Sequence, residues 1–297
     1  MDDRPIGMFD SGFGGLTVAR AVIDLLPGED LVYIGDTARY PYGARGLGEV
    51  RRFATQITRK LVVEDNVKLV VVACNNATAA ALETLRLRFD VPIVGVINAG
   101  VRSLLSVTRS GRVGVIGTVG TIASGAYQRA AAGRRPLLPG GRQVELACAS
   151  CPGFVELVER GETRSHRASA LAERLLAPVR AAGVDSLLLG CTHYPYLART
   201  IGEVMGPDVV LVSSADETAF EVRDILMSTG LGRRGASKGR QRWISSGEVA
   251  PFVRLGQHLF GPELDQAEHW ERPEPAKYAG RMEAAGAAIS GAREAGL

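Results

Sequence analysis

Residues 70–78 of the chain read VVVACNNAT, a run of apolar residues that ends on Cys74 and continues into two asparagines. A second stretch, LLLGCTHYP at residues 187–195, has the same plan, with Cys191 in the place of Cys74. Apolar runs without polar alternation are typical of strands that are covered on both faces, as in parallel sheets. The two stretches therefore predict two buried parallel strands, each with a thiol at its carboxyl end.

Outward from these stretches, short apolar runs alternate with segments of helical period. Apolar residues fall on one face of residues 16–26 and again on one face of residues 50–61. Strands that alternate with helices indicate an α/β fold with parallel sheets. The pattern then restarts, because RVGVIGTVGT at residues 112–121 is similar to PIGMFDSGFGG at residues 5–15. We therefore expect two similar α/β halves.

The expected domain organisation follows from this restart. Residues 1–97 would form a first α/β domain, and residues 98–212 a second one. A helix-like segment at 214–230 and a late strand expected at 242–246 (RWISS) would return to the first domain, so residues 213–270 are assigned to it. Residues 271–297 are rich in Ala and Gly and have little to bury, which predicts a loose helix or a frayed tail.

Composition excludes several classes of protein. The chain has 297 residues, 46% of them hydrophobic, and a formal net charge of only +3, so we expect folded domains and no direct nucleic-acid binding. The basic run at residues 232–242 is interpreted as a solvated loop. No apolar stretch is long enough to cross a bilayer and residues 1–7 do not resemble a signal peptide. Four cysteines are too few for a disulfide scaffold, which favours free thiols in the cytoplasm.

Reactive side chains follow several of the predicted strands. Ligands of open parallel sheets bind beyond the carboxyl ends of the strands. A single cysteine at such an end is usually a small buried hydrophobic residue, but two at matched positions favour chemistry. The residues at these ends, which would line one cleft if the halves face each other, are Asp10, Ser11, Cys74, Thr118, Thr121 and Cys191.

Two opposed thiols suit acid-base chemistry. A thiol has an unperturbed pKa near ~8.5, so moderate assistance makes it either a base or an acid. A thiolate on one side of a carbon and a thiol on the other can remove a proton and return another to the opposite face, which inverts a stereocentre. Asp10 could assist one thiol and His193 the other. In the alternative reading, Asp10 caps a turn and His193 only bonds to backbone.

The surrounding residues include many hydrogen-bond donors that suit the carboxylates of an acidic, zwitterionic small molecule. The side chains are Ser11, Asn75, Asn76, Thr118, Thr121 and Thr192, and the turn amides are those of Gly12, Gly14 and Gly43.

Three other kinds of site are disfavoured. SGFGGL at residues 11–16 followed by Asp36 resembles a dinucleotide fingerprint, but Thr17 stands where the third glycine is needed. CASC at residues 148–151 lacks a second pair for zinc unless Cys74 and Cys191 are recruited, so structural cysteines and no metal are expected. No lysine lies in a turn suited to pyridoxal phosphate, and we expect chemistry without a cofactor.

Five ordered motifs, FDSGFGGLTV, YIGDTARYPYG, ACNNAT, VGVIGT and GCTHYP, together resemble the glutamate racemases, which belong to the cofactor-independent aspartate/glutamate racemase superfamily. The resemblance covers residues 5–270. It implies two α/β domains related by pseudo-twofold symmetry, an active site in the cleft between them, and a homodimer. The implied activity interconverts L- and D-glutamate and supplies D-glutamate for peptidoglycan.

The resemblance also implies residue roles. Cys74 would act on the D-isomer with help from Asp10, and Cys191 on the L-isomer with help from His193 and Glu159. The implied glutamate-binding residues are Asp10, Ser11, Tyr42, Gly43, Asn75, Asn76, Thr118, Thr121, Thr192 and His193. Asn76 departs from the family, which usually has Thr there, although an amide still donates to a carboxylate.

Two alternatives stay open. One is a racemase for aspartate or another acidic amino acid. The other is a binding or regulatory protein that keeps the cleft without turnover, with DNA gyrase as a partner by family analogy.

Overall fold

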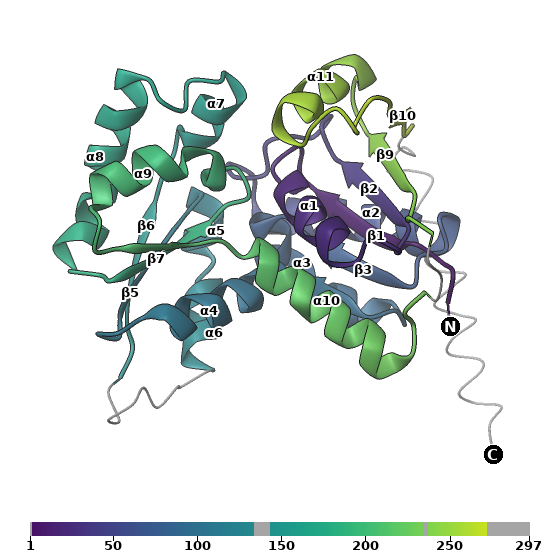
Figure 1. Cartoon of the computed structure of the whole chain (residues 1–297), viewed down its shortest axis with the longest axis horizontal. Coiled ribbons are helices and arrows are strands. Elements are labelled where there is room, and N and C mark those ends of the chain that lie inside the picture. The colour runs from purple at the N-terminus through teal and green to yellow at the C-terminus, as the bar shows by residue number, and fades with distance from the viewer. Residues whose placement is uncertain (1, 134–142, 234–236, 272–297) are drawn as a thin grey trace.

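The computed structural model describes residues 2–133, 143–233 and 237–271, and their strands form two separate sheets (Figure 1). The strand orders are β10-β9-β2-β1-β3-β4 and β6-β5-β7-β8, and the strand pairs of these described sheets are parallel. The order β2-β1-β3-β4 is repeated as β6-β5-β7-β8. This confirms the predicted α/β class with two similar parallel sheets. The parts built on them are called the first half and the second half below.

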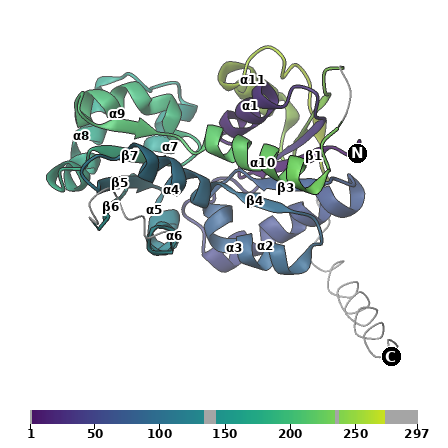
Figure 2. The same ribbon diagram turned by 60° about the horizontal axis from the view of Figure 1, so that its bottom comes forward.

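The first half places helices on both faces of its sheet (Figure 2). Along β1, Met8 packs into the cluster with α1, α10 and α11, while Phe9 packs into the cluster with α2 and α3. Strands buried on both faces need no polar alternation, which explains their continuous apolar runs. Its strands are β1 (Ile6–Asp10), β2 (Leu31–Gly35), β3 (Leu69–Val72), β4 (Ile93–Gly95), β9 (Gln241–Ser245) and β10 (Glu268–His269). Its helices are α1 (Leu16–Leu25), α2 (Leu47–Arg59), the π-helical turn η1 (Lys60–Glu64), α3 (Asn75–Arg88), α10 (Ala215–Thr229) and α11 (Val249–Leu259).

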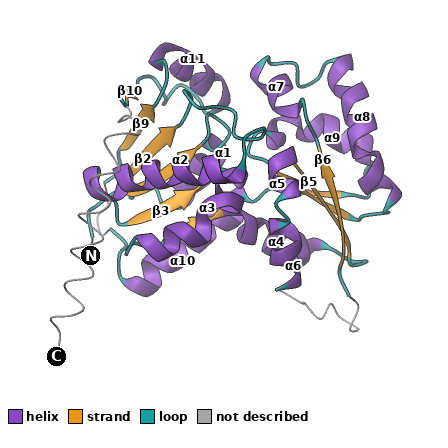
Figure 3. Cartoon of the chain, turned by 180° about the vertical axis from the view of Figure 1, so that it is seen from behind, coloured by secondary structure: helices purple, strands orange, loops and turns teal. Residues whose placement is uncertain are grey.

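The second half is a smaller version of the same plan (Figure 3). Val115 of β5 packs with α4 and α6, and Ile116 packs on the other face with α7, α8 and α9. The strands are β5 (Arg112–Gly117), β6 (Glu145–Ser150), β7 (Ser186–Gly190) and β8 (Val210–Val212). The helices are α4 (Val96–Val107), α5 (Val119–Ala123), α6 (Ala126–Ala132), α7 (Phe154–Glu159), α8 (His166–Ala181), the 3-10 turn η2 (Tyr194–Leu197) and α9 (Ala198–Met205).

Helices α4 and α10 carry the chain from one half to the other and pack against each other. After α10, β9 lies beside β2, so the chain ends its described part in the first sheet. Helix α4 runs across the expected boundary at residues 97 and 98, and the domain limits remain a prediction. The expected tail, apart from Glu271, lies outside the described residues.

Amphipathic periodicity explains the helices that cover the sheets. In α2, Val50, Ala54 and Ile57 are completely buried, whereas Arg51 and Arg52 are exposed. Burial of an aliphatic side chain as large as that of Val50 or Ile57 contributes about 1.5–3 kcal/mol. None of the described helices combines the length and the apolar character that a membrane crossing needs.

Candidate active site

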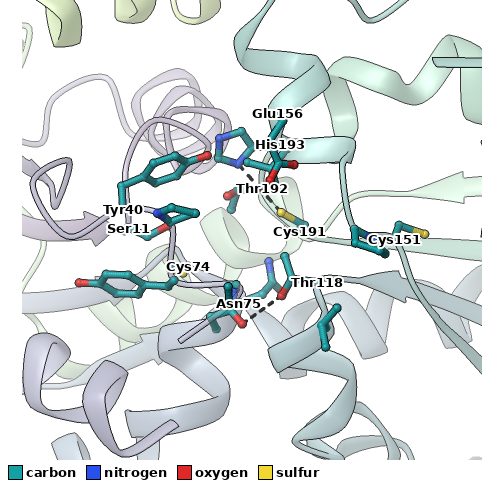
Figure 4. A pocket seen from close by; sticks show the side chains of 18 of the residues that line it. Ser11, Tyr40, Cys74, Asn75, Thr118, Cys151, Glu156, Cys191, Thr192 and His193 are labelled. Carbon is teal, nitrogen blue, oxygen red and sulfur yellow. Dashed lines mark hydrogen bonds between the residues drawn. The ribbon is translucent and has the colours of Figure 1, made fainter. Parts of the chain in front are cut away.

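A cavity of about 380 Å³ lies where the strand ends of the two halves meet, and both Cys74 and Cys191 line it (Figure 4). The lining segments follow β1, β2 and β3 in the first half and β5, β6 and β7 in the second. The lining residues are Ser11, Tyr40, Pro41, Tyr42, Gly43, Ala44, Cys74, Asn75, Asn76, Thr118, Val119, Cys151, Pro152, Gly153, Val155, Glu156, Cys191, Thr192 and His193.

Each thiol sits where a buried strand gives way to a helical turn. Cys74 has extended backbone angles and precedes the first residue of α3, so the free N–H groups of that helix start beside it. Cys191 follows β7, and its carbonyl accepts from Tyr194 N at 3.0 Å as the chain turns into η2. Because β3 and β7 hold equivalent places in the two sheets, the thiols are related by the internal repeat.

The surroundings of Cys74 favour the protonated thiol. Burial and then the Asp10 carboxylate raise its pKa, while hydrogen bonds from Ala77 N–H and the Ser11 side chain partly oppose them. Asp10 is itself buried, with one carboxylate oxygen accepting from Gly12 N at 3.0 Å and the other lacking a partner. Cys74 is therefore placed to donate a proton.

The surroundings of Cys191 include an imidazole beside the sulfur. His193 Nδ1 lies 4.0 Å from its sulfur, and His193 Nε2 lies 3.5 Å from Glu159 Oε1. Burial alone would lower the pKa of His193, but its contacts with Cys191 and Glu159 raise it to about 10. A protonated imidazole stabilises an adjacent thiolate. The two thiols thus have unlike electrostatic surroundings.

Neutral donors and acceptors surround the space between the sulfurs. Asn76 Oδ1 accepts from the hydroxyls of Thr118 and Thr121, both at 3.0 Å, which ties α3 to α5 across the halves. Asn75 Oδ1 accepts from Tyr127 at 2.6 Å, and its Nδ2 is buried without a partner. Among the lining residues none is Lys or Arg. Carboxylates of a ligand would therefore be held by amides, hydroxyls and helix N-termini.

The structure gathers the predicted site residues in and around this cavity. Asp10, Thr121 and Glu159 do not line it, but they contact lining residues or act on their charge. The Tyr42 hydroxyl donates to the Asp36 carboxylate. The predicted residues that line the cavity are Ser11, Tyr42, Gly43, Cys74, Asn75, Asn76, Thr118, Cys191, Thr192 and His193.

Sequence reasoning missed Tyr40, Cys151 and Glu156, which also line the cavity. Tyr40 lies in the loop after β2, and Cys151 comes directly after β6. The sequence rule that ligands bind at strand ends selects strands followed by Asp, Cys or Thr. The same rule, extended to the inner strand β2 and to the edge strand β6, includes both loops.

The CASC segment spans both faces of the second sheet. Cys148 packs with the α4 and α6 cluster, and Cys151 packs with the α7 and α8 cluster. In the part of the chain that the structure describes, no three His, Cys, Asp or Glu residues are grouped as a metal site.

Comparison with known proteins matches residues 15–221 to the Asp/Glu/Hydantoin racemase family model. A glutamate racemase of Acidothermus cellulolyticus is 49% identical over 265 residues, which cover 89% of this chain and 98% of the relative. A glutamate racemase of Mycobacterium leprae is 48% identical over 261 residues, which cover 88% and 93% of the two chains.

Solved structures agree with the sequence comparison. The structure of a glutamate racemase isoform from Bacillus anthracis superposes with a TM-score of 0.82 at 36% identity, covering 90% of this chain and 96% of that one. A Francisella tularensis glutamate racemase in complex with D-glutamate gives a TM-score of 0.80 at 30% identity, covering 92% and 98%. The repeated sheets and the two thiols that line one cavity agree with these matches. The chain therefore belongs to the Asp/Glu/hydantoin racemase family.

Proposed function

We propose that this chain interconverts L- and D-glutamate by moving protons between two thiols and the α-carbon, without a cofactor. The observation that carries the proposal is that Cys74 and Cys191 line one cavity from opposite halves. The names and high identity of the relatives support glutamate as the substrate. D-Glutamate is a component of bacterial peptidoglycan, so the product supplies cell-wall synthesis.

The electrostatic difference between the thiols gives the direction of each proton transfer. The Cys191 thiolate, beside protonated His193, takes the α-proton of L-glutamate. The Cys74 thiol then gives its proton to the opposite face of the carbanion, which yields D-glutamate. Asp10 assists Cys74 and Glu159 assists His193, and the reverse reaction exchanges the roles of the two thiols.

The predicted binding residues hold the substrate between the sulfurs. Asn75 Nδ2 is a buried donor that a carboxylate would satisfy. The remaining proposed contacts come from the side chains and turn amides of Ser11, Tyr42, Gly43, Asn76, Thr118, Thr121, Thr192 and His193, with Asp10 near the ammonium group.

Replacement of either thiol tests the proposal. Cys74→Ser and Cys191→Ser each should lower kcat for racemisation by about 10²-fold to 10⁴-fold, because a hydroxyl is a far weaker acid than a thiol. Circular dichroism of L- and D-glutamate measures the rates. Cys148→Ser is the matched control, since Cys148 is partly exposed and does not line the cavity. Racemisation at wild-type rate in either cavity variant would contradict the mechanism.

Isotope exchange separates this enzyme from the two alternatives. In deuterated water the wild-type protein should exchange the α-proton of glutamate, which a binding protein without turnover would not do. Aspartate in the same assay distinguishes a racemase for a shorter acid, and faster exchange of aspartate than of glutamate would reassign the substrate.

Three further expectations belong to the same proposal. We expect a homodimer, by analogy with the family, which sedimentation equilibrium would detect. We expect a cytoplasmic location, where the four free cysteines would stay reduced. Contact with DNA gyrase stays a prediction from the family analogy alone.

A further inference from the structure

Three buried polar atoms without hydrogen-bond partners come together on the Cys191 side of the cavity: Tyr40 Oη, Glu159 Oε1 and His193 Nε2. The Glu159 and His193 atoms are only 3.5 Å apart, yet they do not form a well-aligned hydrogen bond. The ring centroids of Tyr40 and His193 lie 6.1 Å apart, and Figure 4 shows the Tyr40 phenol extending toward His193. Buried polar groups without partners are unfavourable, so this cluster calls for an explanation.

Tyr40 reaches the cluster from the opposite half of the molecule. It lies in the loop between β2 and α2, whereas Glu159 ends α7 and His193 follows β7. Its ring packs against Gly12, where an added Cβ would come within 2.7 Å of the ring, and it meets Phe13 edge to face at 6.2 Å. The first half therefore holds the ring in place and presents the hydroxyl to the second half.

Charge links the hydroxyl to Glu159. Burial raises the pKa of Tyr40, and the negative charge of the Glu159 carboxylate raises it further. A phenol that keeps its proton is a donor, and an ionised carboxylate accepts several hydrogen bonds. A small adjustment of either side chain would let Glu159 accept from both Tyr40 and His193.

We infer that Tyr40 is a positioning residue whose hydroxyl donates to the Glu159 carboxylate and thereby holds that carboxylate against Nε2 of His193. The inference rests on the proposed racemisation. Its consequence is that the first half, which carries Cys74, also influences the protonation of His193 beside Cys191. Cys191, Glu159 and Asp10 act on the charge of His193, the titratable Tyr40 packs beside its ring, and Glu156 lies on the wall of the same cavity.

Tyr40→Phe tests the inference because it keeps the ring and removes only the hydroxyl. We expect kcat to fall roughly 10-fold to 100-fold, the effect of a hydrogen bond to a charged group, with KM for glutamate within about two-fold of wild type. Glu159 is partly exposed and would turn toward solvent without this donor. His193 would then lose a contact that raises its pKa, so the alkaline limb of the kcat/KM profile should begin at lower pH.

Tyr196→Phe is the matched control. Its hydroxyl donates to the Leu259 carbonyl at 3.2 Å, and Tyr196 does not line the cavity. This variant should keep both kcat and the alkaline limb. Unchanged kcat and an unchanged limb in Tyr40→Phe would overturn the inference, and so would a raised KM with wild-type kcat, which would make Tyr40 a substrate-binding residue.

A second variant covers the case in which Tyr40→Phe does not fold. Glu159→Gln should move the alkaline limb in the same direction, and the double variant Tyr40→Phe/Glu159→Gln should be no slower than Glu159→Gln alone. An unmoved limb in Glu159→Gln, or multiplying effects in the double variant, would overturn the inference. Failure of the proposed function is distinguishable, because the wild-type protein would then neither racemise glutamate nor exchange its α-proton.

Discussion

Gly14 stands where the first half touches the residues beside Cys191. A Cβ at this position would lie 2.3 Å from Thr192 Oγ1 and 2.5 Å from His193 Nδ1, far inside van der Waals contact. Its backbone angles do not require glycine, since Gly14 is not among the residues with positive φ. Close approach of the two halves is therefore the reason for glycine at this position.

Gly14→Ala should lower kcat/KM for glutamate by at least about 100-fold, because the added Cβ would force His193 to move relative to Cys191. Circular dichroism assays measure the rate, and thermal unfolding shows whether the fold is kept. Gly48→Ala is the control, since a Cβ there meets no atom within 4 Å and Gly48 lies in α2. The control should keep the wild-type kcat/KM and should unfold at a temperature no lower than that of wild type. A fully active Gly14→Ala enzyme would contradict this prediction, since it would show that the added Cβ is accommodated without a loss of activity.

The protonation of His193 should also make stability depend on pH. Its pKa in the folded protein is about 10, against an ordinary value of 6.5, so folding favours the protonated form. The resulting stabilisation is fully present below pH 6.5 and is lost as the pH rises toward 10. Urea unfolding of wild type and His193→Asn at a series of pH values measures it. The difference in the free energy of unfolding between the two proteins should shrink between pH 6.5 and pH 10. A difference that stays constant would contradict stabilisation of the fold by protonated His193.

At the scale of elements, the carboxyl ends of the parallel strands form the cavity, and their amino ends contribute to the stability of the fold. The carboxyl ends of β1, β3, β5 and β7 lead into the cavity, whereas the amino end of β3 carries a buried ion pair. Lys68, just before β3, donates to Glu29, just before β2, at 2.5 Å, and Glu29 also accepts from Arg233 N. The side chain of Lys68 is completely buried. Stability and chemistry are thus placed at different ends of the same sheet.

Lys68→Met should reduce the free energy of unfolding by about 3–5 kcal/mol, because it leaves the Glu29 carboxylate buried without its cation. Arg199→Ala removes the exposed pair of Arg199 with Glu203 on α9 and should cost less than about 1 kcal/mol. Urea denaturation measures both values. The kcat of the folded Lys68→Met fraction should equal that of wild type, and a selective loss of kcat would show that this end of the sheet does contribute to the chemistry.

At the scale of the whole molecule, the two halves are joined by specific contacts around the cavity, in addition to the packing of α4 against α10. The Asn76 bonds to Thr118 and Thr121 are one such contact, and the bond from Gly120 N to Gly43 O at 3.2 Å is another. A ligand that is bound by both halves adds further contacts between them. Ligand binding and the stability of the whole fold are therefore coupled.

Glutamate should stabilise the folded protein by mass action, by about 2.7 kcal/mol at a concentration of 100 times its Kd. The double variant Cys74→Ser/Cys191→Ser separates binding from turnover, because it keeps the shape of the cavity while removing both thiols. Thermal unfolding at increasing L- or D-glutamate concentration measures the effect. Equal unfolding temperatures with and without either isomer would contradict a binding site for glutamate in this cavity.

The fold could be predicted in large part because its signals are local. The apolar run before Cys74 and the one before Cys191 identify buried parallel strands, and the turn residues after them identify strand ends. The predicted α/β class and the repeated sheet follow from these signals. The positions of Asp10, Ser11 and Thr118 at strand ends follow from the same rule.

The contacts across the two halves could not be predicted in this way. No local pattern places the Tyr40 ring beside His193 or directs Asn76 Oδ1 to two threonines of the second half. These contacts depend on the angle and distance at which one sheet faces the other. The sequence by itself determined which residues stand at the strand ends, since periodicity and turn chemistry act over a few residues. Only the tertiary structure decided which of them meet, because the packing of two separate sheets is set by many distant contacts at once.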